Sequence, residues 1–205
     1  MHSRYSLTDF EFLDDNFAGD AGRLRELMRA LRTRGYRWGC QLTVKALARD
    51  LSLIDDMHVA GCASMFLGIE TGDPDLLQRV KGTTVDDTNK VIRRLLDVGI
   101  RAHAGFIMGH PWDTEGTISR TTAMVRELRA QGVMCSVSLL TPFPGSPVAE
   151  DPGRFGVTIH CQDPEYYTFS RPVISTRHLT RERLANLYAG LLIDMASEDA
   201  HDVQA

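Results

Sequence analysis

Five segments with strand character recur along the chain, and each is followed by a segment with helical periodicity. They begin near residues 8, 36, 62, 100 and 133. The second is predicted over residues 36–44, and the third, residues 62–69, is nearly all apolar, as expected of a strand buried on both faces. A spacing of about 30 residues is typical of a parallel sheet whose strands are joined by crossover helices. A closed eight-stranded barrel needs roughly 250 residues, and this chain has 205. We therefore predict an α/β fold, a partial (β/α) barrel of about five parallel strands, with a doubly wound sheet as the alternative.

Helical patterns fill the intervals between these strands. Apolar residues at helical spacing predict helices over residues 20–34, 51–60, 74–80, 84–99, 115–131 and 180–196. Thr84 and Thr180 are the expected N-caps of their helices. Residues 1–145 thus form the predicted partial barrel. Residues 146–205 form an irregular C-terminal extension, whose final amphipathic helix is expected to pack on the barrel.

The fourth strand ends in a distinctive turn within IRAHAGFIMGHPWDTE, residues 100–115. Apolar and polar residues alternate as in a pleated strand, and Gly105 and Gly109 leave the backbone open to close approach. Pro111 stops the strand, and residues 113–115 offer capping groups to the next helix. The stretch is typical of the junctions at which α/β sheets bind small molecules, and equally of an ordinary strand–helix turn.

Composition and charge exclude several classes of protein. A formal net charge of -4 and a pI near 6.0 give no support for a nucleic-acid surface. No apolar run approaches the roughly 20 residues that span a bilayer. The amino terminus, MHSRYSLTDF, lacks the apolar core of a secretory signal. We therefore expect a cytoplasmic protein that binds neither nucleic acid nor membrane.

The cysteines are scattered along the chain at positions 40, 62, 135 and 161. They form no CxxC or CxxxCxxC pair, so neither a zinc site nor a local iron–sulfur loop is indicated. Cys40, Cys62 and Cys135 lie in or beside predicted strands. We expect these three to be small buried hydrophobic residues in a reducing compartment.

Polar or glycine-rich segments follow several predicted strands where each strand ends. They are Asp14, Asp15 and Asn16, residues 41–43, Glu70 and Thr71, Gly109 and His110, and residues 142–145. Because the carboxyl ends of parallel strands share one edge, we expect these groups to gather there. They suit a ligand with an amine, a ribose and a base, or a divalent cation held by Asp14, Asp15 and Glu70. Taken singly, each is also explained as a helix cap.

A family resemblance is carried by FLDDNF, WGCQ, MFLGIETGDPDLL, VKGTT, GFIMGHPWDT and LLTPFPGSP, in this order. Together these segments resemble the radical S-adenosylmethionine superfamily, and most of all the branch whose larger members carry an amino-terminal cobalamin-binding domain. The resemblance extends from about Asp9 to Tyr188. It implies a (β/α) barrel fold and S-adenosylmethionine as cofactor.

The resemblance also implies roles for the strand ends. In the family, the acidic turn after the strand at residues 8–13 contacts the methionine amino group of the cofactor. The end of the third predicted strand places a carboxylate and a hydroxyl near the ribose, and the Gly-x-Ile-x-Gly strand passes beside the adenine. The cofactor-binding residues implied in this way are Asp14, Asp15, Glu70, Thr71, Gly72, Gly105, Ile107 and Gly109.

Departures from the family pattern bear on activity. The family binds a 4Fe–4S cluster through CxxxCxxC in the loop after its first strand, and this chain has no such motif. It resembles the family from the second strand onward, so we expect it to lack the first strand, the cluster ligands and the cobalamin domain. Thr43 stands where the family usually has an arginine that pairs with the cofactor's carboxylate. His110 stands at a usually apolar position, where we expect it to hydrogen-bond the edge, with catalysis as the alternative.

Three functions stay open, the most distant being a metal-dependent enzyme with a divalent ion held by Asp14, Asp15 and Glu70. The first is the core of a radical S-adenosylmethionine enzyme, in a fragmentary, truncated or split form, binding the cofactor at the carboxyl edge of the sheet. The alternative is a catalytically degenerate binding or accessory protein that has lost the cluster. With a first strand missing, residues 8–13 would form an exposed edge available to a partner chain or to self-association. The sequence assigns no catalytic residue, metal ligand or substrate.

Overall fold

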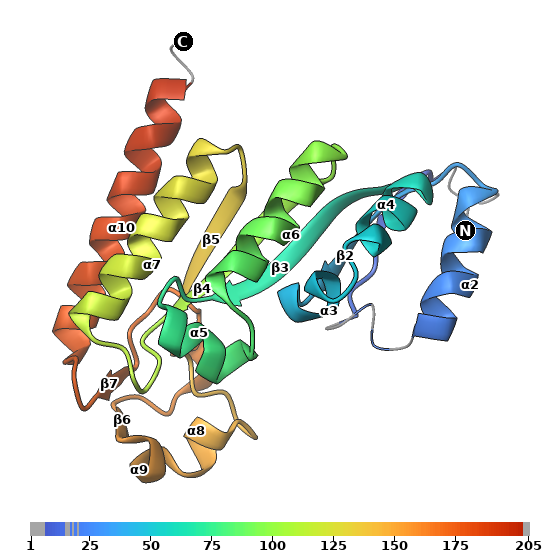
Figure 1. The fold of residues 1–205 in the computed structure, drawn as a ribbon. Coiled ribbons are helices and arrows are strands. Elements are labelled where there is room, and N and C mark those ends of the chain that lie inside the picture. The colour runs from blue at the N-terminus through green and yellow to red at the C-terminus, as the bar shows by residue number, and fades with distance from the viewer. Residues whose placement is uncertain (1–6, 15–16, 18, 20, 203–205) are drawn as a thin grey trace. The chain divides into compact units, whose positions relative to one another are not determined.

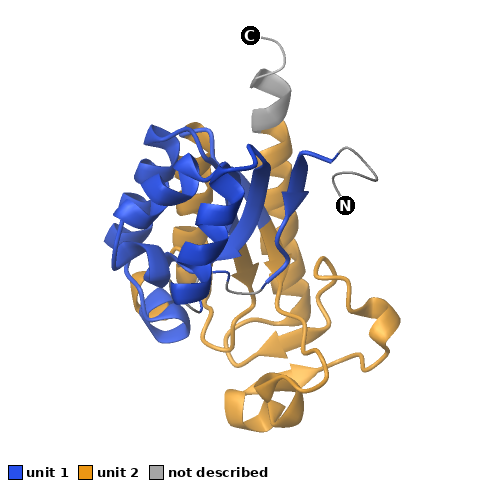
Figure 2. Ribbon diagram, turned by 90° about the vertical axis from the view of Figure 1, so that its right-hand side faces the viewer, with its two compact units in different colours: residues 1–69, 77–105, 131–136 blue, residues 70–76, 106–130, 137–205 orange. Residues whose placement is uncertain are grey.

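The computed structural model describes residues 7–14, 17, 19 and 21–202. The chain divides into two compact units, each assembled from several segments of the sequence (Figure 2). Unit 1 comprises the described residues within 1–69, 77–105 and 131–136. Unit 2 comprises those within 70–76, 106–130 and 137–205.

The main sheet has its strands in sequential order, β1-β2-β3-β4-β5, and they run parallel (Figure 1). Their bounds are Asp9–Glu11, Arg37–Leu42, Cys62–Glu70, Arg101–Met108 and Met134–Leu139. In β1 and β2, Asp9 lies opposite Arg37, and the pairing of β2 with β3 is irregular between Trp38 and Gly39. The predicted α/β partial barrel of five parallel strands is confirmed.

Helices connect the strands, as the prediction required (Figure 1). They are α2 (Ala21–Arg32) after β1, α3 (Val44–Ala48) and α4 (Ser52–Val59) after β2, α5 (Pro74–Lys81) and α6 (Val85–Asp97) after β3, α7 (Glu115–Ala130) after β4, and the final α10 (Arg181–Asp202). α10 continues past residue 196, where we had predicted its end.

Threonine caps fix the start of two helices where the sequence predicted them. Thr84 Oγ1 accepts a hydrogen bond from Asp87 N at 3.1 Å, and Thr180 Oγ1 accepts one from Arg183 N at 3.1 Å. Such caps satisfy amides that have no partner within the helix. The apolar faces that follow are buried at Val91, Ile92 and Leu95 in α6 and at Leu184, Tyr188 and Leu191 in α10.

The strand predicted over residues 36–44 is too long. It ends at Leu42, and Thr43 instead caps α3, because its Oγ1 accepts a hydrogen bond from Ala46 N at 3.3 Å. Val44 is buried at the start of α3. Leu42 and Val44 are both buried, so the apolar alternation of the strand continues into the first residue of α3. The predicted strand was too long for this reason.

β3 and β4 each have one buried face. Met65, Leu67 and Ile69 are at most 1% exposed, and Ala102, Ala104, Phe106 and Met108 are buried in the same way on β4. The alternating side chains form what we call the open face: Ser64, Phe66, Gly68, Glu70, Arg101, His103 and Ile107, all half-buried or exposed. Our interpretation of β3 as buried on both faces is wrong, because only one of its faces is fully covered within the described residues.

The segment predicted to be irregular holds short regular elements of unit 2. They are α8 (Pro147–Glu150), α9 (Pro152–Phe155), β6 (Val157–Ile159), the 3-10 turn η1 (Pro164–Tyr166) and β7 (Ile174–Thr176). β6 and β7 pair antiparallel. Val157, Val173 and Ile174 form a small buried cluster beneath them, which gives the extension a core of its own.

Two of the three cysteines predicted to be buried are so: Cys40 is 0% and Cys62 3% exposed. Cys135 is only half-buried, because it lies near the start of β5, the last strand in the sheet order. In the described part of the chain, no helix is long and apolar enough to cross a membrane.

Candidate functional site

The carboxyl end of β3 turns sharply at Glu70. This residue has φ 74°, a left-handed conformation that is rare and unfavourable for a residue with a side chain. Glu70 is half-buried and belongs to the open face. Strained residues persist only where their surroundings hold them, and they concentrate at functional sites. The residues that follow Glu70 supply that support.

Thr71 and Gly72 attach the end of β3 to α7 through buried hydrogen bonds. The Thr71 hydroxyl, 1% exposed, lies 3.1 Å from the Thr121 hydroxyl and accepts a hydrogen bond from Asp73 N at 3.1 Å. The Thr121 hydroxyl accepts a second one, from Gly72 N at 3.0 Å. A Cβ on Gly72 would lie 2.6 Å from Arg120 O. Both predicted site residues therefore hold the edge of the sheet together.

Asp73 completes this junction and was not predicted. Its Oδ1 accepts a hydrogen bond from Leu76 N at 2.9 Å, and its Oδ2 pairs with Arg120 Nε at 2.6 Å. Burial alone would raise the pKa of Asp73, but the hydrogen bonds from Leu76 N and Arg120 outweigh it and hold that pKa below its usual value. An aspartate directly before Pro74 is an N-cap pattern that could have indicated it.

The turn after β4 is organised by Asp113, which is 2% exposed. Its Oδ2 accepts hydrogen bonds from the backbone N of Gly109 and of His110, both at 2.9 Å. Its Oδ1 accepts one from the Thr117 hydroxyl at 2.6 Å. Thr114 Oγ1 accepts a bond from Thr117 N at 3.3 Å, so the capping role predicted for residues 113–115 is confirmed.

Packing explains the glycines of the turn and of β4. Gly109 has φ 93°, and a Cβ there would lie 2.9 Å from Leu184 Cδ2. A Cβ on Gly105 would overlap the ring of Phe66, so this aromatic side chain fills the space above the glycine. Ile107 remains half-buried on the open face. Of the three residues whose backbone was predicted to pass beside the adenine, Ile107 is thus the one that is not fully buried.

The acidic turn after β1 is described only in part. Asp14 forms an ion pair with Arg23 at 3.1 Å, with 37% of its side chain exposed. Asp15 lies outside the described residues. Asp14 belongs to unit 1, whereas Glu70, Thr71, Gly72, Ile107 and Gly109 belong to unit 2.

Residues 12–142, well over half of the chain, match the family described as the Radical SAM superfamily. The chain belongs to this superfamily. The identification agrees with the strand order and with the motifs at the ends of β3 and β4.

Relatives of this radical SAM protein include methyltransferases. An uncharacterised methyltransferase of Pyrococcus horikoshii is 23% identical over 188 residues, 91% of this chain and 40% of that protein. The bacteriochlorophyllide d C-12(1)-methyltransferase of Chlorobaculum tepidum is 28% identical over 144 residues, 69% of this chain and 31% of that protein. The chain thus spans well under half the length of these relatives.

The fold also matches solved radical SAM structures. The radical S-adenosylmethionine methyltransferase TsrM from Kitasatospora setae, with cobalamin and a [4Fe-4S] cluster bound, has a TM-score of 0.63 at 19% identity. The match covers 91% of this chain and 39% of TsrM. The cobalamin-dependent radical enzyme OxsB, with aqua-cobalamin and S-adenosylmethionine bound, has a TM-score of 0.54 and 16% identity over 75% of this chain and 24% of OxsB.

The cysteines of this radical SAM chain do not fit a 4Fe–4S cluster. In the described part of the chain, no three His, Cys, Asp or Glu side chains are grouped to hold a metal ion. A cluster needs thiolates, but a hydrogen bond with Cys62 and burial both raise the pKa of the Cys40 thiol far above its usual value. Cys135 and Cys161 are half-buried elsewhere. The cluster would need ligands that the described residues do not supply.

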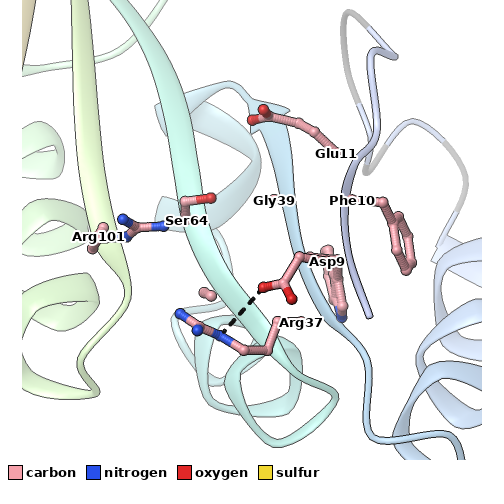
Figure 3. Close-up of a pocket in the computed structure, with 9 residues that line it drawn as sticks. Asp9, Phe10, Glu11, Arg37, Gly39, Ser64 and Arg101 are labelled. Atoms are coloured by element: carbon pink, nitrogen blue, oxygen red, sulfur yellow. Dashed lines mark ion pairs between the residues drawn. The ribbon is translucent and has the colours of Figure 1, made fainter. Parts of the chain in front are cut away.

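A concavity lies in unit 1, at the amino-terminal ends of the strands, and was not predicted. Its volume is about 320 Å³, and it is lined by Asp9, Phe10, Glu11, Arg37, Trp38, Gly39, Ala63, Ser64 and Arg101. Figure 3 shows Asp9 and Arg37 turned toward each other, with the ion-pair atoms 3.8 Å apart. Both side chains are about two-thirds exposed, so the pair contributes little to stability.

Proposed function

We propose that this chain forms the S-adenosylmethionine-binding sheet of a methyltransferase-like radical SAM protein, with the cofactor at the carboxyl ends of β3 and β4. The strained Glu70 on the open face carries this proposal. Its carboxylate ends a strand that belongs to the superfamily's motif, and the backbone there is fixed by hydrogen bonds of Thr71, Gly72 and Asp73. Two relatives that are named methyltransferases support the reaction class.

In this proposal, two residues contact the cofactor and the others keep the strand ends in position. The Glu70 carboxylate would accept hydrogen bonds from the ribose hydroxyls, and Ile107 would pack against the adenine. Thr71, Gly72, Gly109 and Asp113 would keep the edge in shape. Bound S-adenosylmethionine supplies a transferable methyl group and, in enzymes that hold a cluster, a radical. The second function, an accessory protein that binds the nucleoside without cleaving it, is favoured because the described residues hold no group of cysteine ligands.

The test is ligand binding to wild type and to Glu70→Gln. Gln keeps the size and the backbone conformation of Glu70 but removes its charge. We expect S-adenosylhomocysteine to bind wild type no tighter than about the high-micromolar range, because Thr43 stands where the family usually has an arginine and the described residues group no cluster ligands to hold the amino-acid end. Glu70→Gln should lower the affinity by about tenfold or more, and Glu70→Ala should abolish binding.

Glu26→Gln, on the exposed surface of α2, is the control for loss of one carboxylate and should bind as wild type does. Isothermal titration calorimetry measures all four proteins. Equal affinity of wild type and Glu70→Gln would show that the carboxylate has no role in ligand binding.

A further inference from the structure

The concavity at the amino-terminal ends of the strands holds two acidic and two basic side chains, and only one of each is paired within it. Its volume of about 320 Å³ is at the lower end of the range of small-molecule sites. Asp9 and Arg37 form the ion pair described above. Glu11 and Arg101 line the same pocket, and neither side chain forms a hydrogen bond or an ion pair with another described residue. One carboxylate and one guanidinium of the pocket are therefore left for a ligand.

The strand register places these two groups at opposite ends of a row. Glu11 on β1 lies opposite Gly39 on β2, and Gly39 lies opposite Ser64 on β3. Arg101 begins β4, the next strand of the sheet, and lines the pocket together with Ser64. Neighbouring strands are about 4.8 Å apart, so the backbones at Glu11 and Ser64 are separated by roughly 10 Å. The row thus runs from an acid, across a glycine and a hydroxyl, to a base.

Gly39 leaves a gap in the middle of this row. A Cβ there would lie 2.5 Å from Ser64 Oγ and 3.0 Å from Glu11 Oε1, so both oxygens lean over the glycine. Figure 3 shows Glu11 reaching from β1 toward β2 and Arg101 reaching from β4 toward β3, whereas Phe10 points away from the pocket. The pocket therefore presents oxygen acceptors above Gly39 and the N–H donors of a guanidinium at its other end.

We infer that this pocket binds a small amino acid, with its ammonium group at Glu11 and Ser64 and its carboxylate at Arg101. An ammonium group donates charge-assisted hydrogen bonds to a carboxylate, and a guanidinium binds a carboxylate through two parallel N–H···O bonds. A ligand with a single charge would also meet side chains of its own sign, since the pocket holds two acids and two arginines. This site goes beyond the proposed function, because it lies in unit 1 and uses none of the residues assigned there.

Glycine is the smallest probe of this site, and acetate and methylammonium each carry one of its two charges. Backbone amide NMR at neutral pH and constant ionic strength follows the titrations. Glycine, or its longer homologues β-alanine and 4-aminobutyrate, should shift the Gly39 and Ser64 amides. Acetate and methylammonium should bind about tenfold more weakly or less. Gly132, which follows α7 in the same unit, is the control and should not move.

Two outcomes of these titrations would overturn the inference. The first is that none of the three amino acids shifts the Gly39 and Ser64 amides. The second is that acetate or methylammonium binds as tightly as the best of the amino acids, because the pocket would then recognise one charge and not the pair.

Variants assign the two ends of the ligand. Glu11→Gln should lower the affinity for the amino acid by about tenfold, so that it binds no better than acetate. Arg101→Gln should lower it in the same way, to the level of methylammonium. Both side chains are exposed, so neither variant should change the melting temperature. Glu26→Gln on α2 and Arg93→Gln on α6, also exposed, are the charge-matched controls and should bind as wild type does. Wild-type affinity in Glu11→Gln or in Arg101→Gln would contradict the site.

Gly39→Ala tests the gap without changing any charge. Gly39 does not have a positive φ, and the atoms that a Cβ would meet are the ends of two side chains that can rotate, Ser64 Oγ and Glu11 Oε1. The variant should therefore fold. Its methyl group displaces both oxygens from above the glycine, so amino-acid binding should be lost. A folded Gly39→Ala protein with wild-type affinity would show that the ligand does not bind over this residue.

Discussion

Replacement of Thr121 by valine removes one hydroxyl from the junction between β3 and α7. That hydroxyl donates a hydrogen bond to Thr117 O at 3.1 Å. It accepts hydrogen bonds from Gly72 N at 3.0 Å and from the Thr71 hydroxyl at 3.1 Å. Valine would leave two buried donors, the Gly72 amide and the Thr71 hydroxyl, without an acceptor. An unsatisfied buried donor costs about 1–3 kcal/mol, so we expect a loss of about 2–4 kcal/mol in the free energy of unfolding.

Thr88→Val is the matched control. Thr88 is also a fully buried helical threonine, but its hydroxyl donates only to Thr84 O at 3.0 Å. Thr84 O already accepts the Thr88 amide, so valine there orphans no group and should cost less than about 1 kcal/mol. Urea unfolding followed by circular dichroism measures both variants. For a chain of this size, a loss of about 3 kcal/mol corresponds to roughly 6–12 °C in melting temperature. If Thr121→Val loses no more stability than Thr88→Val, the junction does not hold the edge as described.

Three further outcomes can be checked. The folded-state pKa of Asp73 lies below its ordinary value of 3.8. Its carboxylate therefore stabilises the fold above about pH 4, and that stability is lost as pH falls through the folded-state pKa. Asp73→Asn should reduce this loss of unfolding free energy at acid pH, and an unchanged dependence of urea unfolding on pH would contradict the assignment. β1 pairs only with β2 among the described strands, so we propose that its other edge accepts a further strand. The backbone amides on that edge should exchange rapidly with solvent, and the protein should self-associate. A monodisperse monomer with protected β1 amides would refute an open edge. Anaerobic reconstitution with iron and sulfide should leave no 4Fe–4S cluster, and stoichiometric iron with visible absorption surviving gel filtration would show that the thiols can gather.

The architecture was predictable because each element carries its own signal. The apolar alternation of β4 and the threonine caps of α6 and α10 act locally, so the sequence reveals them. α3 and the β6–β7 pair were missed for the same reason. Thr43 and Val44 continue the strand pattern while starting a helix, and β6 and β7 have three residues each, too few for a periodicity.

The candidate site was less predictable, because its residues act through contacts distant in sequence. Thr71 was expected at the ribose, which stays a prediction, and the fold shows that its hydroxyl is bound to Thr121, fifty positions along the chain. Gly105 was expected to bring its backbone beside the adenine, which stays a prediction, and the fold adds that a Cβ at this position would overlap the Phe66 ring. A motif shows that a residue is special, but only the fold shows whether a helix, an aromatic ring or a ligand requires it.

The residues that follow Glu70 at the end of β3 together fix the backbone conformation of that residue. Glu70 adopts a conformation that costs about 1–2 kcal/mol for a residue with a side chain. The chain on its carboxyl side is held by two buried hydrogen bonds, from Thr121 to Thr71 and from Thr121 to Gly72, and by the part-buried ion pair of Arg120 with Asp73. These contacts offset the conformational cost at Glu70 in the protein without ligand. A ligand that meets the Glu70 carboxylate thus finds the backbone already ordered, and its binding energy need not order the turn.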